Sequence, residues 1–344
     1  MADAIWSSTP AVVGYVLLNV FCSCGVVFAS KLVYLNLPFC FVATLTLINT
    51  ISTWIGMFLV EQLGFYTAAS FSPQSLLPLA LGFCGYVLLN SLSLSLNSVG
   101  VFQVLKIAAT PMVVALEAAV SRRLSAGPKG AAALALACGG VGVATGFDAS
   151  ARANLGGVAV GLAAVAATGL YQFWSARKQH ELQANSSQLL FAYTPQAILI
   201  IAIAAPLVDS YGGWAGFREA LSAHPLPDTV LGYGYGIRTT SAILLAALLG
   251  VLVSLSTFLV LATTSPATYS LLGHAKTVLI LAGGCWLFGD SMSWQRGAGV
   301  AAAMAGVAAY AFIASQASKP VVAPRRASRE TAPLITSHPV DTEP

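Results

Sequence analysis

The sequence predicts an all-α polytopic membrane protein with ten transmembrane helices, arranged as two inverted five-helix repeats. Of the 344 residues, 57% are hydrophobic and 8% are charged, whereas about 25% of residues are charged in an average soluble domain. The mean hydropathy is +0.80. Ten apolar runs are each long enough to cross a hydrocarbon core of about 30 Å. Each half of the chain also carries one lysine deep inside a predicted helix.

Short polar connections separate the apolar runs and set the bounds of the predicted helices. These bounds are roughly 11–31, 38–60, 76–96, 98–120, 129–147, 155–175, 188–208, 241–263, 266–288 and 294–315. We expect one ten-helix domain over 1–315, with the first repeat at about 11–147 and the second at about 155–315. The tail 316–344 is rich in proline and polar residues, which favours disorder.

The placement of lysine and arginine predicts the orientation, because these residues accumulate on the cytosolic side of membrane proteins. With the N-terminus in the cytosol, nine of the sixteen basic residues fall on the cytosolic side. Five, including Lys31 and Arg296, fall on the opposite side, and Lys106 and Lys276 lie inside the membrane. Both termini are therefore expected in the cytosol.

The first two spans carry polar residues with two possible uses. Lys31 lies at the end of the first span, where we predict an interfacial lysine that reaches toward water, with a substrate contact as the alternative. The second span has Thr46, Asn49, Thr50 and Thr53 at helical spacing. We expect these side chains to form hydrogen bonds between helices rather than to line a pore.

The fourth span contains the first deep lysine. Lys106 lies about eight or nine residues into the helix, a depth of roughly 12–14 Å. A lysine inside the bilayer is costly and indicates a functional site. The residues on its face are Phe102, Gln103, Lys106 and Thr110. Pro111 cannot donate the usual helical hydrogen bond and is expected to kink the helix.

The fifth and tenth spans resemble each other. Lys129–Gly139 aligns with Arg296–Gly306, and the same alignment places Lys106 opposite Lys276. Five helices per unit is an odd number, so two copies would be inverted in the membrane, with a site at their interface near the midplane. The small residues of these spans allow close helix packing and suggest a homodimer seam.

The sixth and seventh spans offer aromatic and amide side chains. Tyr171 and Gln172 lie on a polar, aromatic face of the sixth span, and the seventh contains Gln188 and Tyr193.

The ninth span contains the second deep lysine. Pro266 marks the helix start, because proline is tolerated at the first helical position. Lys276 is then about ten residues inside, roughly 15 Å deep, where a lysine costs about 2.5–3.5 kcal/mol. The residues on its face are Tyr269, Gly273, Lys276 and Gly283. This face presents a ring, a cation and two gaps where the backbone can approach a ligand.

Three segments carry a family resemblance: Thr264–Thr277, Asn97–Lys106 and Lys178–Gln183. The chain resembles the nucleotide-sugar and triose-phosphate translocator branch of the drug/metabolite transporter superfamily. Within this branch it is most similar to plant and algal UDP-xylose and UDP-rhamnose/UDP-galactose transporters. The resemblance implies a ten-helix inverted-repeat fold in the Golgi membrane. It also implies antiport of a cytosolic UDP-sugar against lumenal UMP.

The resemblance further implies that Lys276 and Gly273 contact the phosphates or the sugar, and that the seventh span helps to read the nucleotide. Lys106 and Lys276, one from each half, suit the neutralisation of two phosphates. The rings that suit the base are those of Phe102, Tyr171, Tyr193 and Tyr269. The side chains that suit hydroxyl groups are those of Gln103, Thr110, Gln172 and Gln188.

We expect substrates and membrane lipid as partners, with no cofactor, metal or nucleic acid. A plastid-type exchanger of phosphate and phosphorylated C3 compounds would use the same lysines, but no serine- and arginine-rich transit peptide precedes the first span. A membrane-embedded enzyme acting on a lipid phosphate would need clustered carboxylates or histidines, whereas Glu117 is the one acidic residue predicted well inside a span. A non-transporting scaffold gives no reason for two deep lysines.

Overall fold

The computed structural model describes residues 9–37, 39–64, 66–122, 127–211, 229–264 and 266–317, and over these residues it contains helices and no strand. The helices are α2 (Thr9–Asn36), α3 (Val42–Gln62), α4 (Pro73–Leu96), α5 (Val99–Ile107), α6 (Ala109–Ser121), α7 (Gly127–Gly146), α8 (Ala149–Ala153), α9 (Leu155–Glu181), α10 (Ser186–Val208), α12 (Ile237–Thr263), α13 (Pro266–Phe288) and α14 (Trp294–Ala317). The tail predicted to be disordered lies, from residue 318 onward, outside the described residues.

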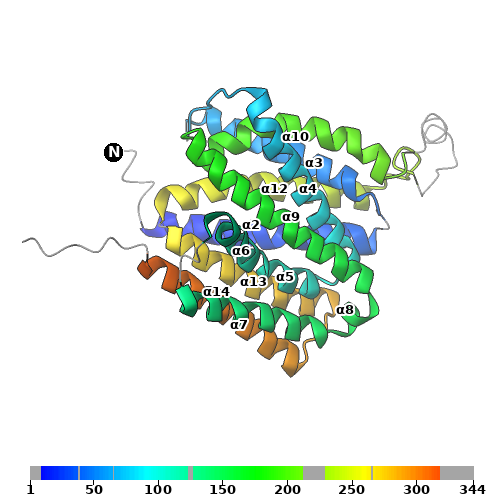
Figure 1. Cartoon of the computed structure of the whole chain (residues 1–344). Helices are drawn as coiled ribbons and strands as arrows, with labels where there is room; N and C mark the ends of the chain where they lie inside the picture. The colour runs from blue at the N-terminus through cyan, green and yellow to red at the C-terminus, as the bar shows by residue number, and fades with distance from the viewer. Residues whose placement is uncertain are drawn as a thin grey trace, which may run out of the picture.

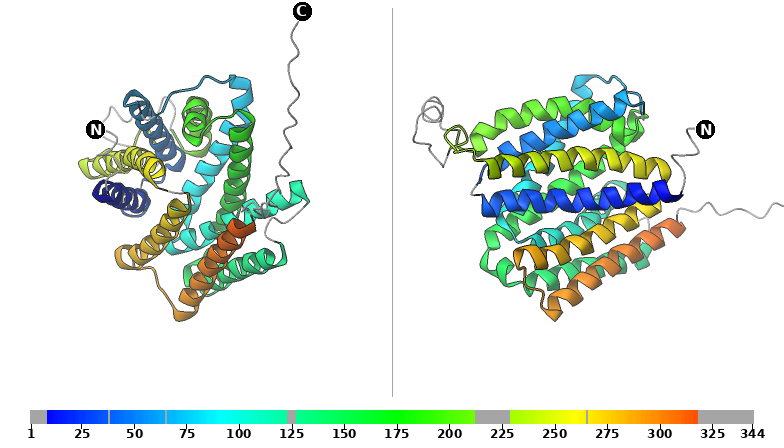
Figure 2. Two further views of the ribbon diagram at one scale, coloured as in Figure 1. Left: turned by 90° about the vertical axis from the view of Figure 1, so that its left-hand side faces the viewer. Right: turned by 180° about the vertical axis from the view of Figure 1, so that it is seen from behind.

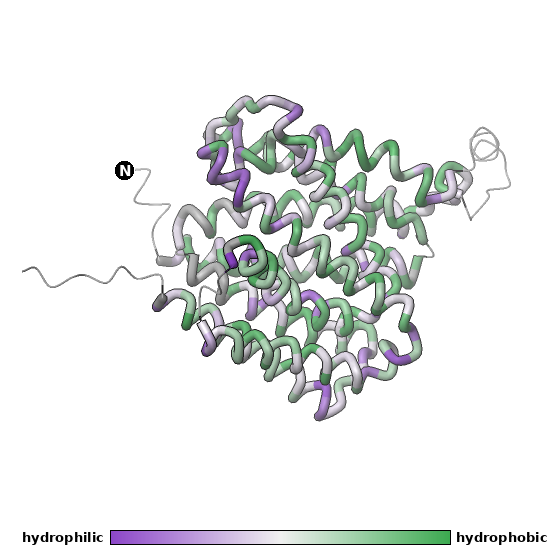
Figure 3. Tube along the Cα trace, viewed as in Figure 1, coloured by the Kyte–Doolittle hydropathy of each residue, from purple (hydrophilic) through white to green (hydrophobic). Residues whose placement is uncertain are grey.

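Most helices are long and apolar enough to cross a membrane. Within the described part of the chain, nine segments meet this condition by length and composition, and they match nine of the predicted spans. The remaining predicted span is α13, whose apolar part Leu272–Phe288 is shorter. Hydrophobic residues dominate the helices, and hydrophilic residues gather near their ends (Figure 3). The polytopic all-α fold is confirmed, whereas the division into two inverted repeats stays a prediction.

The fourth predicted span is divided into α5 and α6. Helix α5 ends at Ile107, and the amide of Ala108 donates to the carbonyl of Leu105 at 2.9 Å, which tightens the last turn. Pro111 follows and lacks the N–H that would bond to the carbonyl of Ile107. The predicted kink is confirmed, and it lies next to Lys106.

The helices run side by side, with α4 and α5 between the outer ones (Figures 1 and 2). Helix α4 packs against α3, α9 and α10, while α5 packs against α7, α9 and α13. Helix α2 packs against α12 and α13. The two helices that carry the deep lysines, α5 and α13, are therefore direct neighbours.

Small residues hold α7 and α14 together within one chain. A Cβ atom added to Gly140 would lie 2.4 Å from the backbone nitrogen of Ala303, and one added to Gly306 would lie 2.5 Å from that of Ala137. Numbers fall along α14 as they rise along α7, so the helices are antiparallel. Because these faces are used inside the chain, they do not serve as the suggested seam between two copies. A homodimer stays a prediction.

The chain enters α2 and leaves α14 at the same end of the bundle, which we call the terminal end (Figures 1 and 2). The turns after α2, α4, α7 and α13 lie at the opposite end, which we call the far end. This arrangement agrees with the prediction that both termini share one side of the membrane. Which side is cytosolic stays a prediction.

Candidate functional site

Lys276 on α13 is held inside the bundle by polar side chains of two other helices. Its Nζ donates a hydrogen bond to Oδ1 of Asn19 on α2. Nδ2 of Asn19 donates to the hydroxyl oxygens of Ser256 and Thr257 on α12, each at 3.0 Å. Because Asn19 and Ser256 are fully buried, this network fixes the position of the ammonium group.

Lys106 on α5 faces an interior cavity. Its Nζ lies 5.6 Å from the ring centroid of Phe102, in a cation–π geometry. Its side chain is exposed despite its depth in the predicted span. With Asn90 and Thr168 it lines a narrow cavity between α4, α5 and α9. Access to water lowers the cost of a charge at this depth.

The two deep lysines lie in neighbouring parts of the bundle. They come from helices that are in direct contact, α5 and α13. Two like charges in an interior of low dielectric repel each other, and an anion between them would lower the electrostatic energy. The structure therefore places the two residues that the sequence singled out on adjacent helices.

Two other predicted residues of the fourth span lie outside this cavity. The residues of this span that line it are Phe102, Leu105, Lys106 and Ala109. Gln103 is only 4% exposed, and its Oε1 has no hydrogen-bond partner among the described residues. Thr110 is partly buried in the first turn of α6. Thr110 follows the break after Ile107, so helical spacing from Lys106 does not hold there, whereas Gln103 lies in the same helix as Lys106 and is buried on another side.

The two glycines on the face of Lys276 differ. A Cβ atom added to Gly273 would meet nothing within 4 Å, so the backbone there borders open space. A Cβ atom added to Gly283 would lie 2.3 Å from the ring of Phe28. The expected second gap is therefore wrong, because Phe28 of α2 fills it. The side chain of Tyr269 lies outside the described residues.

Tyr171 on α9 and Tyr193 on α10 form one aromatic cluster. Their hydroxyl groups share a hydrogen bond, and the ring of Tyr171 stacks on Tyr86 with centroids 5.0 Å apart. The centroid of Phe83 lies 5.3 Å from that of Tyr193. Because Tyr193 is 1% exposed, its ring is not available to stack on a base in this state. It supports Tyr171, which is only partly buried.

The two glutamines predicted to bind hydroxyl groups of a ligand have different surroundings. Gln172 is exposed on α9, one turn beyond Thr168. Gln188 closes the capping box of α10 with Asn185 and donates to the carbonyl of Thr67 at 3.0 Å. The amide of Gln188 is thus committed to the start of a helix, and the structure gives this residue a structural role instead of a substrate contact.

Lys31 is buried, with 3% exposure, so the prediction of an interfacial lysine is wrong. Its Nζ donates to the carbonyl oxygens of Leu94 at 2.9 Å, Ser95 at 3.3 Å and Asn97 at 2.6 Å. Carbonyls at a helix end lack helical donors and favour a positive charge. All three ammonium hydrogens donate to carbonyl oxygens at the end of α4, which argues against a substrate contact.

An ion pair at the far end was not predicted. Arg296 and Asp148 are joined at 2.6 Å with side-chain exposures of 2% and 1%. Beside them, a carboxylate oxygen of Asp290 accepts from the amide of Gly100 at 2.7 Å. These contacts tie the start of α5, the turn after α7 and the turn after α13 together. From the sequence, we used Arg296 in the charge count and in the repeat alignment and predicted no ion pair for it.

The polar face of α3 also departs from the prediction. Thr46, Thr50 and Thr53 donate to carbonyls of their own helix at 2.7–2.9 Å. With Asn49 they line a pocket of about 210 Å³ between α3 and α4. These threonines do not join helices as expected. Because Asn90 lines both this pocket and the cavity of Lys106, the two spaces adjoin.

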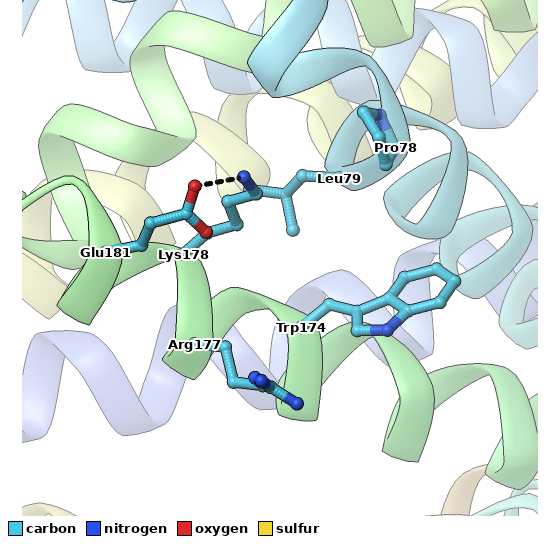
Figure 4. A pocket seen from close by; sticks show the side chains of 6 residues that line it. All are labelled: Pro78, Leu79, Trp174, Arg177, Lys178 and Glu181. Carbon is cyan, nitrogen blue, oxygen red and sulfur yellow. Dashed lines mark hydrogen bonds and ion pairs between the residues drawn. The ribbon is translucent and has the colours of Figure 1, made fainter.

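Another pocket, of about 280 Å³, lies between the first turns of α4 and the last turns of α9 (Figure 4). Its α9 wall consists of Trp174, Arg177, Lys178 and Glu181. Lys178 is paired with Glu181 at 2.8 Å. Neither deep lysine lines this pocket, so we place the candidate site in the interior, where α5 and α13 are in contact.

The sequence matches the model of the triose-phosphate transporter family over residues 12–311. UDP-xylose transporter 1 of Arabidopsis thaliana is 32% identical over 94% of this chain and 92% of that protein. UDP-xylose transporter 2 of the same plant is 30% identical over 87% and 80%, respectively. UDP-rhamnose/UDP-galactose transporter 1 of that plant is 27% identical over 87% and 82%.

Proposed function

The chain belongs to the triose-phosphate transporter family, and from this premise we propose that it is a Golgi antiporter that exchanges a UDP-sugar for UMP. Membership in a family of transporters confirms the predicted resemblance and the prediction that the chain is not an enzyme. The names of the relatives favour UDP-xylose, UDP-rhamnose or UDP-galactose as the cargo.

One observation carries the proposal: Lys106 and Lys276 lie inside the bundle on two helices that are in contact. Phosphate groups are acceptors that bind ammonium groups through charge-assisted hydrogen bonds. A diphosphate between the two lysines would neutralise both charges. The stacked ring of Tyr171 and the open space at Gly273 leave room for the other parts of a nucleotide sugar.

Contacts at the far end of the bundle support alternating access as the transport mechanism. The buried pair of Arg296 and Asp148, together with the bond from Gly100 to Asp290, holds the far end together. The distribution of charges assigns this end to the lumen. We therefore take this conformation as closed toward the lumen, with loading from the cytosol.

Charge balance gives a reason for exchange. An empty carrier would have to rearrange around two repelling cations in low dielectric, which is costly. Either the UDP-sugar or the returning UMP would cancel that charge during the transition. The protein would then change between its two conformations efficiently only with a substrate bound. Transport in one direction would therefore be coupled to transport in the other, which is antiport.

The test is uptake of radiolabelled nucleotide sugars by liposomes that contain the purified protein. We expect uptake of at least one UDP-sugar that is strongly stimulated by UMP inside the liposomes. Equal rates with and without internal UMP would reject obligate exchange. The family description also favours a second candidate, an exchanger of phosphate and phosphorylated C3 compounds. Triose phosphate in the same panel separates the two, because only this candidate predicts its uptake.

A further inference from the structure

The α3–α4 pocket, lined by Thr46, Asn49, Thr50, Thr53, Phe83, Tyr86, Val87, Asn90 and Ser91, has an unusual chemistry. No charged residue lines it. Its volume is about 210 Å³, well above the roughly 10–15 Å³ that holds one water molecule. It therefore suits an uncharged polar group larger than water.

The hydroxyl hydrogens of three threonines in this wall are already committed. Thr46 donates to Val42, Thr50 to the carbonyl of Thr46, and Thr53 to the carbonyl of Asn49. A hydroxyl has one hydrogen and two acceptor lone pairs. Each threonine therefore offers the pocket an acceptor and no donor.

Asn90 adds to this pattern at the junction with the lysine cavity. Its Nδ2 donates both hydrogens, to the carbonyl of Tyr86 at 2.8 Å and to Thr168 at 3.0 Å. Its Oδ1 is left as an acceptor. The Oδ1 of Asn49 is buried and has no hydrogen-bond partner among the described residues. The carboxamide of Asn49 can thus turn toward a ligand without losing a bond at that oxygen.

A ligand that satisfies these acceptors must bring several donors, while the possible donors of the wall are the amide nitrogen of Asn49 and the hydroxyl groups of Tyr86 and Ser91. Phosphate oxygens are acceptors only, so they cannot bond to the threonine and Asn90 oxygens. A uracil ring carries one N–H donor. A glycosyl group carries several hydroxyl groups, each of which can donate. Since Asn90 also lines the cavity of Lys106, a phosphate at the lysine would place the attached sugar next to this pocket.

We propose that the α3–α4 pocket binds the glycosyl group of the cargo and that Thr50 and Thr53 contribute to sugar specificity. This inference rests on the proposed function and deepens it. The nucleotide part then stays with Lys106, Lys276 and Tyr171.

The test compares two ligands that differ by the glycosyl group. The double variant Thr50→Val/Thr53→Val keeps the side-chain volume and removes two acceptors. In liposomes, we expect the KM for the UDP-sugar that the wild type transports to rise roughly 2- to 10-fold per lost hydrogen bond. The KM for UMP in UMP–UMP exchange should stay unchanged, because UMP has no glycosyl group.

Two further variants separate specificity from folding. Ser52→Ala is the matched control, because Ser52 makes the same kind of bond to its own helix, at 2.9 Å to Ile48, but does not line the pocket. It should leave both KM values unchanged. Thr50→Ser/Thr53→Ser retains the hydroxyl groups and should restore the KM for the UDP-sugar.

Each other outcome contradicts the proposal in its own way. An equal rise in both KM values would place the nucleotide in the pocket, and unchanged values would remove the pocket from the binding site. Both results leave the proposed function intact. If the wild type exchanges UMP or triose phosphate but no UDP-sugar, the proposed function fails and the glycosyl site fails with it.

Discussion

Lys276 donates a hydrogen bond to Asn19, a residue 257 positions away in the chain. The same carboxamide is held by two hydroxyl groups of α12. Three helices thus converge on one ammonium group, and a charge that lipid would not tolerate has a defined polar environment. This hydrogen-bond network is the structural basis for the role that we assign to Lys276.

Replacing Lys276 by alanine should abolish transport, because one side of the diphosphate would lose its cation. A charge-assisted hydrogen bond contributes about 1.5–3 kcal/mol, so kcat/KM should fall at least about 10-fold. The measurement is exchange in liposomes at matched protein incorporation. Lys178→Ala is the control, because its exposed pair with Glu181 lies outside the site and contributes little. Normal exchange by Lys276→Ala would remove this lysine from the site.

Replacing Asn19 should affect substrate affinity through Lys276. Asn19→Ala removes the acceptor and should raise KM modestly, because the ammonium group loses its fixed position. Asn19→Asp supplies a carboxylate that pairs with the lysine and competes with the phosphates, so it should raise KM more. The order of the two KM values, at equal yield of folded protein, is the readout. The reverse order would show that Asn19 supports only the fold.

Removing one charge of the ion pair at the far end should destabilise the protein more than removing both charges. Arg296→Met leaves the buried carboxylate of Asp148 without its partner, which costs about 3–5 kcal/mol. The double variant Arg296→Met/Asp148→Asn removes both charges of the pair and should unfold closer to the wild type. A double-mutant cycle of melting temperatures in detergent measures the coupling. Additive losses would mean that the two charges do not interact.

A side chain on the packed face of α7 should disrupt its contact with α14. Gly140→Val would place atoms within 2.4 Å of the Ala303 backbone nitrogen, and overpacking of this kind costs about 1–3 kcal/mol or more. Gly139→Val is the matched control on the same helix, since nothing lies within 4 Å of its Cβ position. Melting temperature and the monodisperse fraction after purification report the difference. Similar losses in both variants would mean that helix propensity, rather than packing, sets the effect.

Much of this fold follows from local sequence. Apolar run lengths identify the membrane class and the spans, because hydrocarbon thickness sets a minimum helix length. Pro111 identifies the break between α5 and α6, because a missing donor acts within one turn. Lys106 and Lys276 are conspicuous because of their depth in apolar helices, whatever their neighbours.

The partners of these residues were decided by the tertiary structure alone. Lys31 resembles an interfacial lysine in sequence, yet it serves the end of α4, 63 positions away. Gly283 resembles a gap for a ligand, yet Phe28 fills it. Arg296 forms its ion pair with Asp148 only when α7 and α14 pack together. Helical periodicity predicts the depth of a residue and the face on which it lies. The rotation and tilt of each helix decide which residues that face contacts. Rotation and tilt depend on the packing of all helices together.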